Sequence, residues 1–150
     1  MLDFPALWNL ALPYDTFVAA SELKHRGLWH GLHRLARIPT WALAAVPADA
    51  DLKLLVLAED WCGDASNTIP ILAKLGDLAP GIELRVLKRD EYPEVMDQYL
   101  TNGARSIPVV IRSWTFASFG RGASLDSCGW TAMRTAVLIT VNVPYLTCVW

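Results

Sequence analysis

The sequence predicts an α/β domain in which a central sheet is flanked by helices. The chain has 150 residues, 53% hydrophobic and 19% charged, so it is long enough for one buried core and too apolar for a disordered chain. The nearly all-apolar run at 52–58 is typical of a strand buried on both faces. From there to residue 112 the patterns alternate strand, helix, strand, helix, strand, the order expected of helices layered on a sheet.

Residues 1–50 are expected to form an N-terminal helical extension. The stretch 15–39 is predicted to be one helix, which Asp15 or Thr16 would cap and Ile38-Pro39 would end. The stretch WALAAVPADAD adds a short helix and a loop. The long helix has an apolar stripe at i, i+4 and i+7, formed by Leu28, Leu32 and Leu35. Three tryptophans are expected to dock this region onto the sheet: Trp8, Trp29 and Trp41.

Residues 51–112 are expected to form the core of the domain. Pro70 should kink its first helix, and Pro93 suits the first turn of its second. The Pro80-Gly81 pair is a turn signal between the first helix and the second strand. The predicted elements are a strand at Leu52–Ala58, a helix at Gly63–Leu78, a strand at Ile82–Leu87, a short helix within 91–100 and a strand at 107–112.

Residues 113–150 form an atypical C-terminal segment. Residues 1–111 contain 14 acidic residues, whereas Asp126 is the one acid after residue 111. Trp114 to Phe119 could form a strand, but no amphipathic pattern for a covering helix follows. This abrupt change suggests the hypothesis of a shifted reading frame or a truncated end.

Charge and hydropathy limit the classes of partner. The net charge of −2, without a basic stripe, argues against a nucleic acid or an anionic membrane. No run of 18 uncharged apolar residues occurs, and the N-terminus lacks a basic signal-peptide region. The three cysteines are an odd number at wide spacing, so we expect no disulfide framework, a cytoplasmic location and no bound cofactor.

Cys62 is the strongest candidate for chemistry because it follows a buried strand and opens a helix. Unpaired backbone N–H groups and the helix dipole favour a thiolate at such a position. Asp64 in the first helical turn has the opposite effect, because its carboxylate repels the thiolate. Trp61 offers an apolar wall for a docked partner. The alternative is an inert cysteine that only fills the core.

The segment WCGDASNTIPIL resembles the active-site segment of the thioredoxin family, which has a Trp-Cys-Gly-Pro-Cys motif. The family's helix is kinked by a proline eight residues after the first cysteine, and Pro70 stands eight after Cys62. The resemblance extends over about 52–111. Further downstream the family's ordered landmarks match Asp90, Pro93, Tyr99, Ile107 and Pro108. In the family the last of these prolines is cis and faces the active-site cysteine.

The resemblance also exposes two departures. Ala65 replaces the second, resolving cysteine, and Val56 replaces the family's buried acid, so ordinary dithiol reductase activity is doubtful. More narrowly, AEDWCGDASNT is similar to a bacterial subgroup with a Trp-Cys-Gly-Asp-Ala motif. The resemblance therefore implies a thioredoxin-like sheet with a single active-site cysteine.

We predict monothiol thiol–disulfide exchange through Cys62, with a protein or low-molecular-weight disulfide as partner. An external thiol, with glutathione as a possible co-substrate, would resolve the mixed disulfide, although oxidation to a sulfenic acid sensor is a further possibility. The alternative is a non-catalytic interaction module that binds an extended peptide beside the proline. The predicted substrate-binding residues are Trp61, Gly63, Asp64, Ile107 and Pro108.

The remaining candidates are weighed against plainer structural roles. Glu59 and Asp60 are possible proton acceptors, with a surface role at the strand end as the favoured alternative. His30 and His33 could share a metal, but with His25 they fit a solvated or partly packed helix face better, and no metal site is predicted. The run LKRDEYPE is interpreted as a solvated strand end. Cys128 or Cys148 would resolve Cys62 internally only if the tail folds back.

Overall fold

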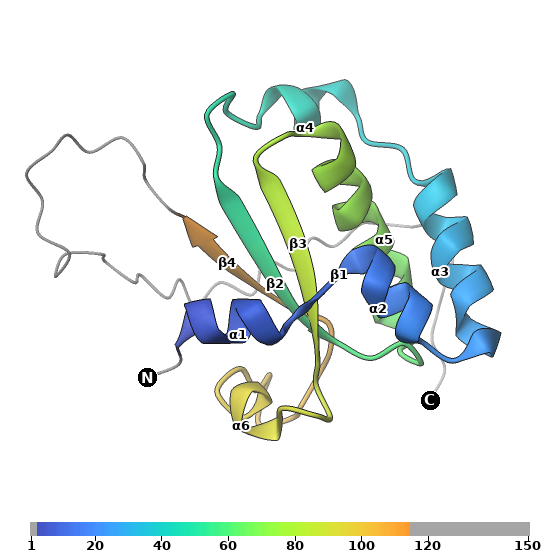
Figure 1. The fold of residues 1–150 in the computed structure, drawn as a ribbon, viewed down its shortest axis with the longest axis vertical. Coiled ribbons are helices and arrows are strands. Elements are labelled where there is room, and N and C mark those ends of the chain that lie inside the picture. Colours follow the sequence, from blue (N-terminus) through green and yellow to red (C-terminus); the bar gives the residue numbers. More distant parts are fainter. Residues whose placement is uncertain (1–2, 115–150) are drawn as a thin grey trace, which may run out of the picture.

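The computed structural model describes residues 3–114, which form a four-stranded mixed sheet between two layers of helices (Figure 1). The strand order is β1-β3-β2-β4; β2 and β3 run parallel, whereas β1 pairs antiparallel with β3 and β4 with β2. The strands are β1 (Leu12–Pro13), β2 (Leu52–Ala58), β3 (Ile82–Lys88) and β4 (Val109–Trp114). The predicted α/β class, with helices flanking a central sheet, is confirmed.

Helices cover both faces of this sheet. One core cluster joins α2, α3 and α5 to one face, and a second joins α1 and α6 to the other. The helices are α1 (Phe4–Leu10), α2 (Tyr14–Ala20), α3 (Leu23–Leu35), α4 (Thr40–Ala44), α5 (Gly63–Leu78) and α6 (Pro93–Met96). Strand β2 lies between the two layers of helices and contributes side chains to both core clusters.

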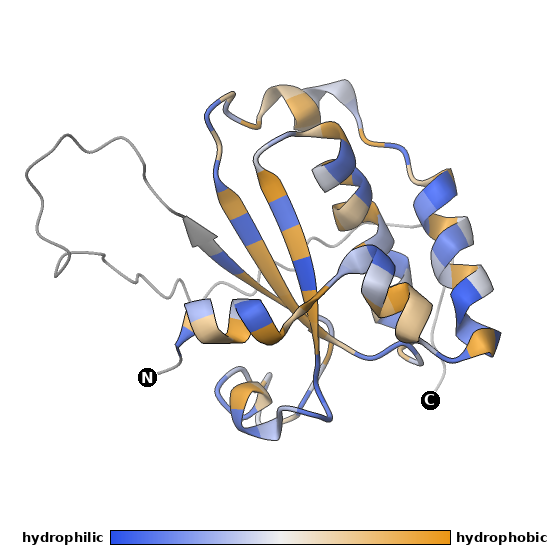
Figure 2. Cartoon of the chain, viewed as in Figure 1, coloured by the Kyte–Doolittle hydropathy of each residue, from blue (hydrophilic) through white to orange (hydrophobic). Residues whose placement is uncertain are grey.

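Side chains along β2 alternate between the two core clusters. Leu54, Val56 and Ala58 pack against the α5 side, whereas Leu55 and Leu57 pack against the α1 side. All five are buried, and Figure 2 shows apolar residues concentrated in the strands while α3 is largely hydrophilic. Burial on both faces explains why the sequence of this strand is an unbroken apolar run.

The core elements agree closely with the sequence. Strand β2 and helix α5 have the predicted bounds, and β3 extends one residue further, to Lys88. Helix α6 is limited to Pro93–Met96, and β4 begins at Val109 because the loop before it continues through Pro108. Gly81 has φ +99 and lies so close to the Ala50 carbonyl that a Cβ would collide with it, as the predicted turn requires.

The single long helix predicted over 15–39 is wrong. Two helices, α2 and α3, are separated by Ser21 and Glu22, both with extended backbone. The Ser21 hydroxyl donates a 2.9 Å hydrogen bond to the Phe17 carbonyl, so it satisfies the end of α2 instead of continuing the helix. Neither Asp15 nor Thr16 caps the start of α2, where Pro13 occupies the N-cap position.

The predicted apolar stripe is also wrong, because the leucines do not form the buried face of α3. Leu28 and Leu35 are 53% and 65% exposed, and Leu32 is half-buried. The buried residue of α3 is Trp29, whose ring lies 5.1 Å from Phe17 and 6.3 Å from Tyr14 between ring centroids. One large aromatic side chain therefore anchors this helix.

The other two tryptophans expected to dock the extension differ in burial. Trp8 is buried in α1, as expected of a docking residue, whereas Trp41 is 74% exposed and docks nothing in the described part of the chain. Helix α1 and strand β1 were not predicted. The Asp3 carboxylate caps α1 by accepting a 3.2 Å hydrogen bond from the Ala6 N–H, and Pro5 occupies its first turn.

The strand suggested at 114–119 lies outside the described residues except for Trp114, which ends β4. The covering helix, Cys128 and Cys148 also fall outside them. Within residues 3–114, none of the helices combines the length and the apolar character needed to cross a bilayer.

Candidate functional site

Cys62 lies where β2 gives way to α5. It is the N-cap residue of this helix and has extended backbone, with φ −78 and ψ 117. Its N–H donates to the Glu59 carbonyl at 3.2 Å, and its own carbonyl accepts from the Ser66 N–H at 3.0 Å. These bonds hold the free, half-buried thiol at the amino end of the helix, where the dipole is positive.

The loop before β4 closes over the thiol. The Cys62 Sγ lies 3.6 Å from the Ile107 carbonyl oxygen, to which the thiol donates. The Ile107–Pro108 peptide bond is cis, and both residues are half-buried. The structure therefore brings together the cysteine and the proline loop, which are 45 residues apart in the chain.

The first turn of α5 shapes the approach to the sulfur. Gly63 and Asp64 are exposed, and a Cβ at Gly63 would meet no atom within 4 Å. Ala65 points into the core and is fully buried. The surface next to Cys62 is thus open at Gly63 and Asp64, while the position of the missing second cysteine is closed to solvent.

Glu59 is buried, not a surface residue of the strand end. The residue is only 7% exposed, and its Oε1 accepts a 2.8 Å hydrogen bond from the Asp90 N–H. Burial raises the pKa of Glu59, and the hydrogen bond from Asp90 partly opposes this shift. The favoured surface interpretation fails because the next loop packs over the carboxyl group.

Asp60 is directed toward the N-terminal extension. Its Oδ2 accepts a 2.7 Å hydrogen bond from the Glu22 N–H, and its carbonyl accepts a 3.0 Å bond from the Trp29 indole N–H. The carboxylate is thereby engaged at the start of α3. This contact gives the N-terminal extension a direct part in fixing the backbone two residues before Cys62.

Trp61 stands beside the thiol and is 51% exposed. The guanidinium carbon of Arg89 lies 5.1 Å from the centroid of its ring. Arg89 was not predicted as a site residue because it belongs to the charged run LKRDEYPE, interpreted as a solvated strand end. The side chain of Arg89 is only 19% exposed, so for this residue that interpretation is wrong.

The histidines of α3 do not gather around a metal site. The Nε2 of His33 lies 2.9 Å from an Asp77 carboxylate oxygen on α5, and its ring lies 5.2 Å from that of Tyr14. His30 is exposed. Among residues 3–114 there is no group of three or more histidine, cysteine, aspartate or glutamate side chains suited to hold an ion.

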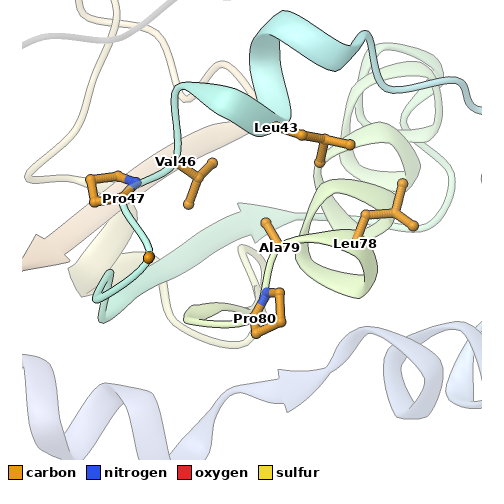
Figure 3. Close-up of a pocket in the computed structure, with 7 residues that line it drawn as sticks. Leu43, Val46, Pro47, Leu78, Ala79 and Pro80 are labelled. Atoms are coloured by element: carbon orange, nitrogen blue, oxygen red, sulfur yellow. The ribbon is translucent and has the colours of Figure 1, made fainter.

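A hollow of about 310 Å³ lies at the other end of α5 (Figure 3). The 16 residues of α5 place it about 24 Å from Cys62. The residues that line it have apolar side chains and include Leu43, Val46 and Pro47 on the α4 side and Leu78, Ala79 and Pro80 at the end of α5. It offers no group for acid, base or nucleophilic chemistry.

Comparisons with known proteins agree with the α/β fold of this chain. The sequence matches the model of the thioredoxin family over residues 13–113, and no curated protein matches it. A crystal structure of a protein of unknown function from Pseudomonas aeruginosa is 20% identical, with a TM-score of 0.65 over 76% of this chain and 71% of that one. The crystal structure of an HIV epitope-scaffold is likewise 20% identical, with a TM-score of 0.66 over 75% and 71%. These two structures share the fold, and the family match covers most of the chain, which therefore belongs to the thioredoxin family.

Proposed function

We propose that the protein carries out monothiol thiol–disulfide exchange through Cys62. The observation that carries this proposal is the position of the sulfur. It lies at the amino end of α5, half-buried, and 3.6 Å from the carbonyl oxygen of Ile107 in the cis-proline loop. A cysteine that only filled the core would be fully buried, whereas the free thiol of Cys62 is half-buried.

The reaction proceeds in two exchanges. The Cys62 thiolate attacks one sulfur of a substrate disulfide, so a mixed disulfide forms and the other substrate sulfur leaves as a thiolate. An external thiolate, such as that of glutathione, then attacks the bound substrate sulfur. This step releases a new disulfide and restores the Cys62 thiolate, with no net oxidation of the protein. Ala65 cannot perform the second attack, so we assign this step to the external thiol.

Each residue around the sulfur would contribute a different contact to substrate binding. Trp61 supplies an exposed apolar face, and the absence of a side chain at Gly63 leaves room for the substrate. The backbone of Ile107 beside Pro108 can pair with an extended peptide segment, as in strand addition. Asp64 is exposed in the first turn of α5, two residues after Cys62, where its carboxylate would accept hydrogen bonds from a docked substrate.

A non-catalytic interaction module is the second candidate. It is favoured by the two buried apolar residues at positions where the family has its chemical groups, because Ala65 and Val56 are both 0% exposed. In this alternative the cis-proline loop and Trp61 would bind a partner segment without any exchange at Cys62.

The proposal extends to the protein's setting. We assign it to the bacterial subgroup with the Trp-Cys-Gly-Asp-Ala motif and expect it to work in the cytoplasm, where glutathione or another small thiol is available. Its partners would be proteins or low-molecular-weight disulfides, and the exchange needs no bound cofactor.

The test isolates one thiol. A Cys128→Ser, Cys148→Ser variant is incubated with oxidised glutathione and with a peptide disulfide, and the intact mass is measured before and after adding reduced glutathione. We expect one adduct, lost when reduced glutathione is added, and none after Cys62→Ser is introduced. The alkylation rate of the thiol is also followed against pH. Absence of an adduct at Cys62, with partner binding unchanged in Cys62→Ser, would establish the module instead.

A further inference from the structure

We propose that Arg89 is a positioning residue that holds the Cys62 loop and the cis-proline loop in register for a docked peptide. This inference rests on the proposed exchange function and names a residue outside the family's active-site motif. Arg89 follows β3 directly, at the edge of the sheet where β2 also ends.

One guanidinium group touches both sides of the site. Its carbon lies 5.1 Å from the ring centroid of Trp61, the residue before Cys62. Its Nη1 donates a 3.1 Å hydrogen bond to the carbonyl of Arg105, two residues before Ile107. A single side chain therefore spans the two segments between which the thiol lies.

Arg89 is itself held firmly. Its Nε donates a 2.8 Å hydrogen bond to the Asp90 carboxylate, and its Nη2 lies 2.8 Å from the same oxygen. Its main-chain N–H bonds to the Ala58 carbonyl at the end of β2. The neighbouring Asp90 N–H bonds to the buried Glu59 carboxyl group. These bonds attach the main chain at Arg89 to β2, the strand that leads to Cys62.

The far side of the bridge is fastened as well. The Arg105 guanidinium makes a two-pronged ion pair with Asp97, with N–O distances of 2.6 and 2.8 Å. This pair holds the loop whose carbonyl Arg89 contacts. Loss of the Arg89 side chain would therefore free Trp61 and the carbonyl of Arg105 relative to each other, while Asp97 and Arg105 remain paired.

The consequence depends on the substrate. A peptide disulfide needs the sulfur, the Trp61 face and the proline-loop backbone at fixed separations, whereas a small disulfide needs only the sulfur. Displacement of a docking surface by about 1 Å can lower a rate by up to ~100-fold. Arg89 should accordingly act on peptide exchange far more than on exchange with a small molecule.

The experiment compares Arg89→Met and Arg89→Lys with the wild type and with Arg34→Met, a control at an exposed position on α3. Exchange rates are measured with a peptide disulfide and with hydroxyethyl disulfide. For Arg89→Met we expect kcat/KM with the peptide to fall ~10- to 100-fold and the rate with the small disulfide to change by less than ~3-fold. Lysine keeps the positive charge but lacks the planar guanidinium group, so Arg89→Lys should restore part of the lost rate with the peptide. Equal losses with both disulfides, or no loss with the peptide, would overturn the inference.

A second readout does not depend on exchange. In protein labelled with 5-fluorotryptophan, the ¹⁹F resonance of Trp61 is assigned with Trp61→Phe, and the amide resonance of Ile107 is recorded in parallel. Both should shift in Arg89→Met and stay in place in Arg34→Met. If the wild type forms no mixed disulfide, the proposed function fails, and this readout alone decides the role of Arg89: shifted resonances support it, and unchanged ones refute it.

Discussion

Replacement of Trp29 by phenylalanine tests whether the N-terminal extension is structurally joined to the candidate site. Trp29 is fully buried between Phe17 and Tyr14, and its indole N–H donates a 3.0 Å hydrogen bond to the Asp60 carbonyl. The substitution keeps an aromatic ring in the core. It removes the donor and the part of the indole that reaches the loop before Cys62.

The expected loss has two parts. A lost hydrogen bond of this kind costs about 1 kcal/mol. The phenyl ring also lacks two carbons of the indole, which at about 0.8 kcal/mol for each buried carbon adds ~1.5 kcal/mol. The free energy of unfolding should therefore fall by about 2.5 kcal/mol.

The assay is urea unfolding followed by far-ultraviolet circular dichroism, since the substitution itself alters tryptophan fluorescence. Trp41→Phe is the matched control, because Trp41 is 74% exposed and its change should stay within about 0.5 kcal/mol. A loss below ~0.5 kcal/mol for Trp29→Phe, or equal losses for the two variants, would refute the reasoning.

Three further substitutions test the site. Burial raises the pKa of Glu59, so its contribution to stability is full below pH 4.5 and declines as the pH rises through the raised value. In Glu59→Gln the free energy of unfolding, measured in urea at successive pH values, should therefore decline less as the pH rises. A difference in free energy of unfolding from wild type that stays constant with pH would contradict this. Asp64→Asn should speed alkylation of Cys62 by about 2- to 5-fold at low salt and less at high salt, because a nearby negative charge is removed; equal rates would refute this effect. In the Cys128→Ser, Cys148→Ser background, Ala65→Cys places a second thiol one helical turn from Cys62, and mild oxidation should give an internal disulfide detectable as the loss of two hydrogen atoms in the intact mass; if both thiols of this variant persist after oxidation, the helical geometry is contradicted.

The centre of the fold could be predicted from the sequence because it obeys local rules. The apolar run of β2 follows from burial on both faces, and α5 begins directly after its N-cap Cys62 and contains Pro70 within it. The place of Cys62 also followed from its position between β2 and α5, whereas the expectation that the proline loop faces it came from the resemblance to the thioredoxin family. A single sequence shows directly which segments are apolar enough to be buried and in which order the elements follow along the chain.

The N-terminal extension could not be predicted because its packing runs against its periodicity. Leu28 and Leu35 of α3 are exposed and Leu32 is half-buried, whereas Trp29 is the buried residue of this helix. The break at Ser21 depends on a hydroxyl that bonds back to Phe17, a choice that composition does not reveal. For α1 a signal existed, in the capping residue Asp3 followed by Pro5.

The role of charged residues around the site was also hidden in the sequence. Glu59 and Arg89 belong to charged stretches of the kind that are usually solvated. Their burial depends on the loop after β3 folding back over the end of β2, through bonds from Arg89 and Asp90 to Ala58 and Glu59. Such contacts join residues about 30 positions apart, and no local pattern encodes them.

Strand β1 has a consequence for self-association. It occupies the outer side of β3 with only Leu12 and Pro13, and proline has no N–H to offer a further strand. A short, proline-ended rim of this kind is a poor template for another copy of the chain. On this flank the sheet is thus guarded against edge-to-edge stacking and the fibrous aggregates to which it leads.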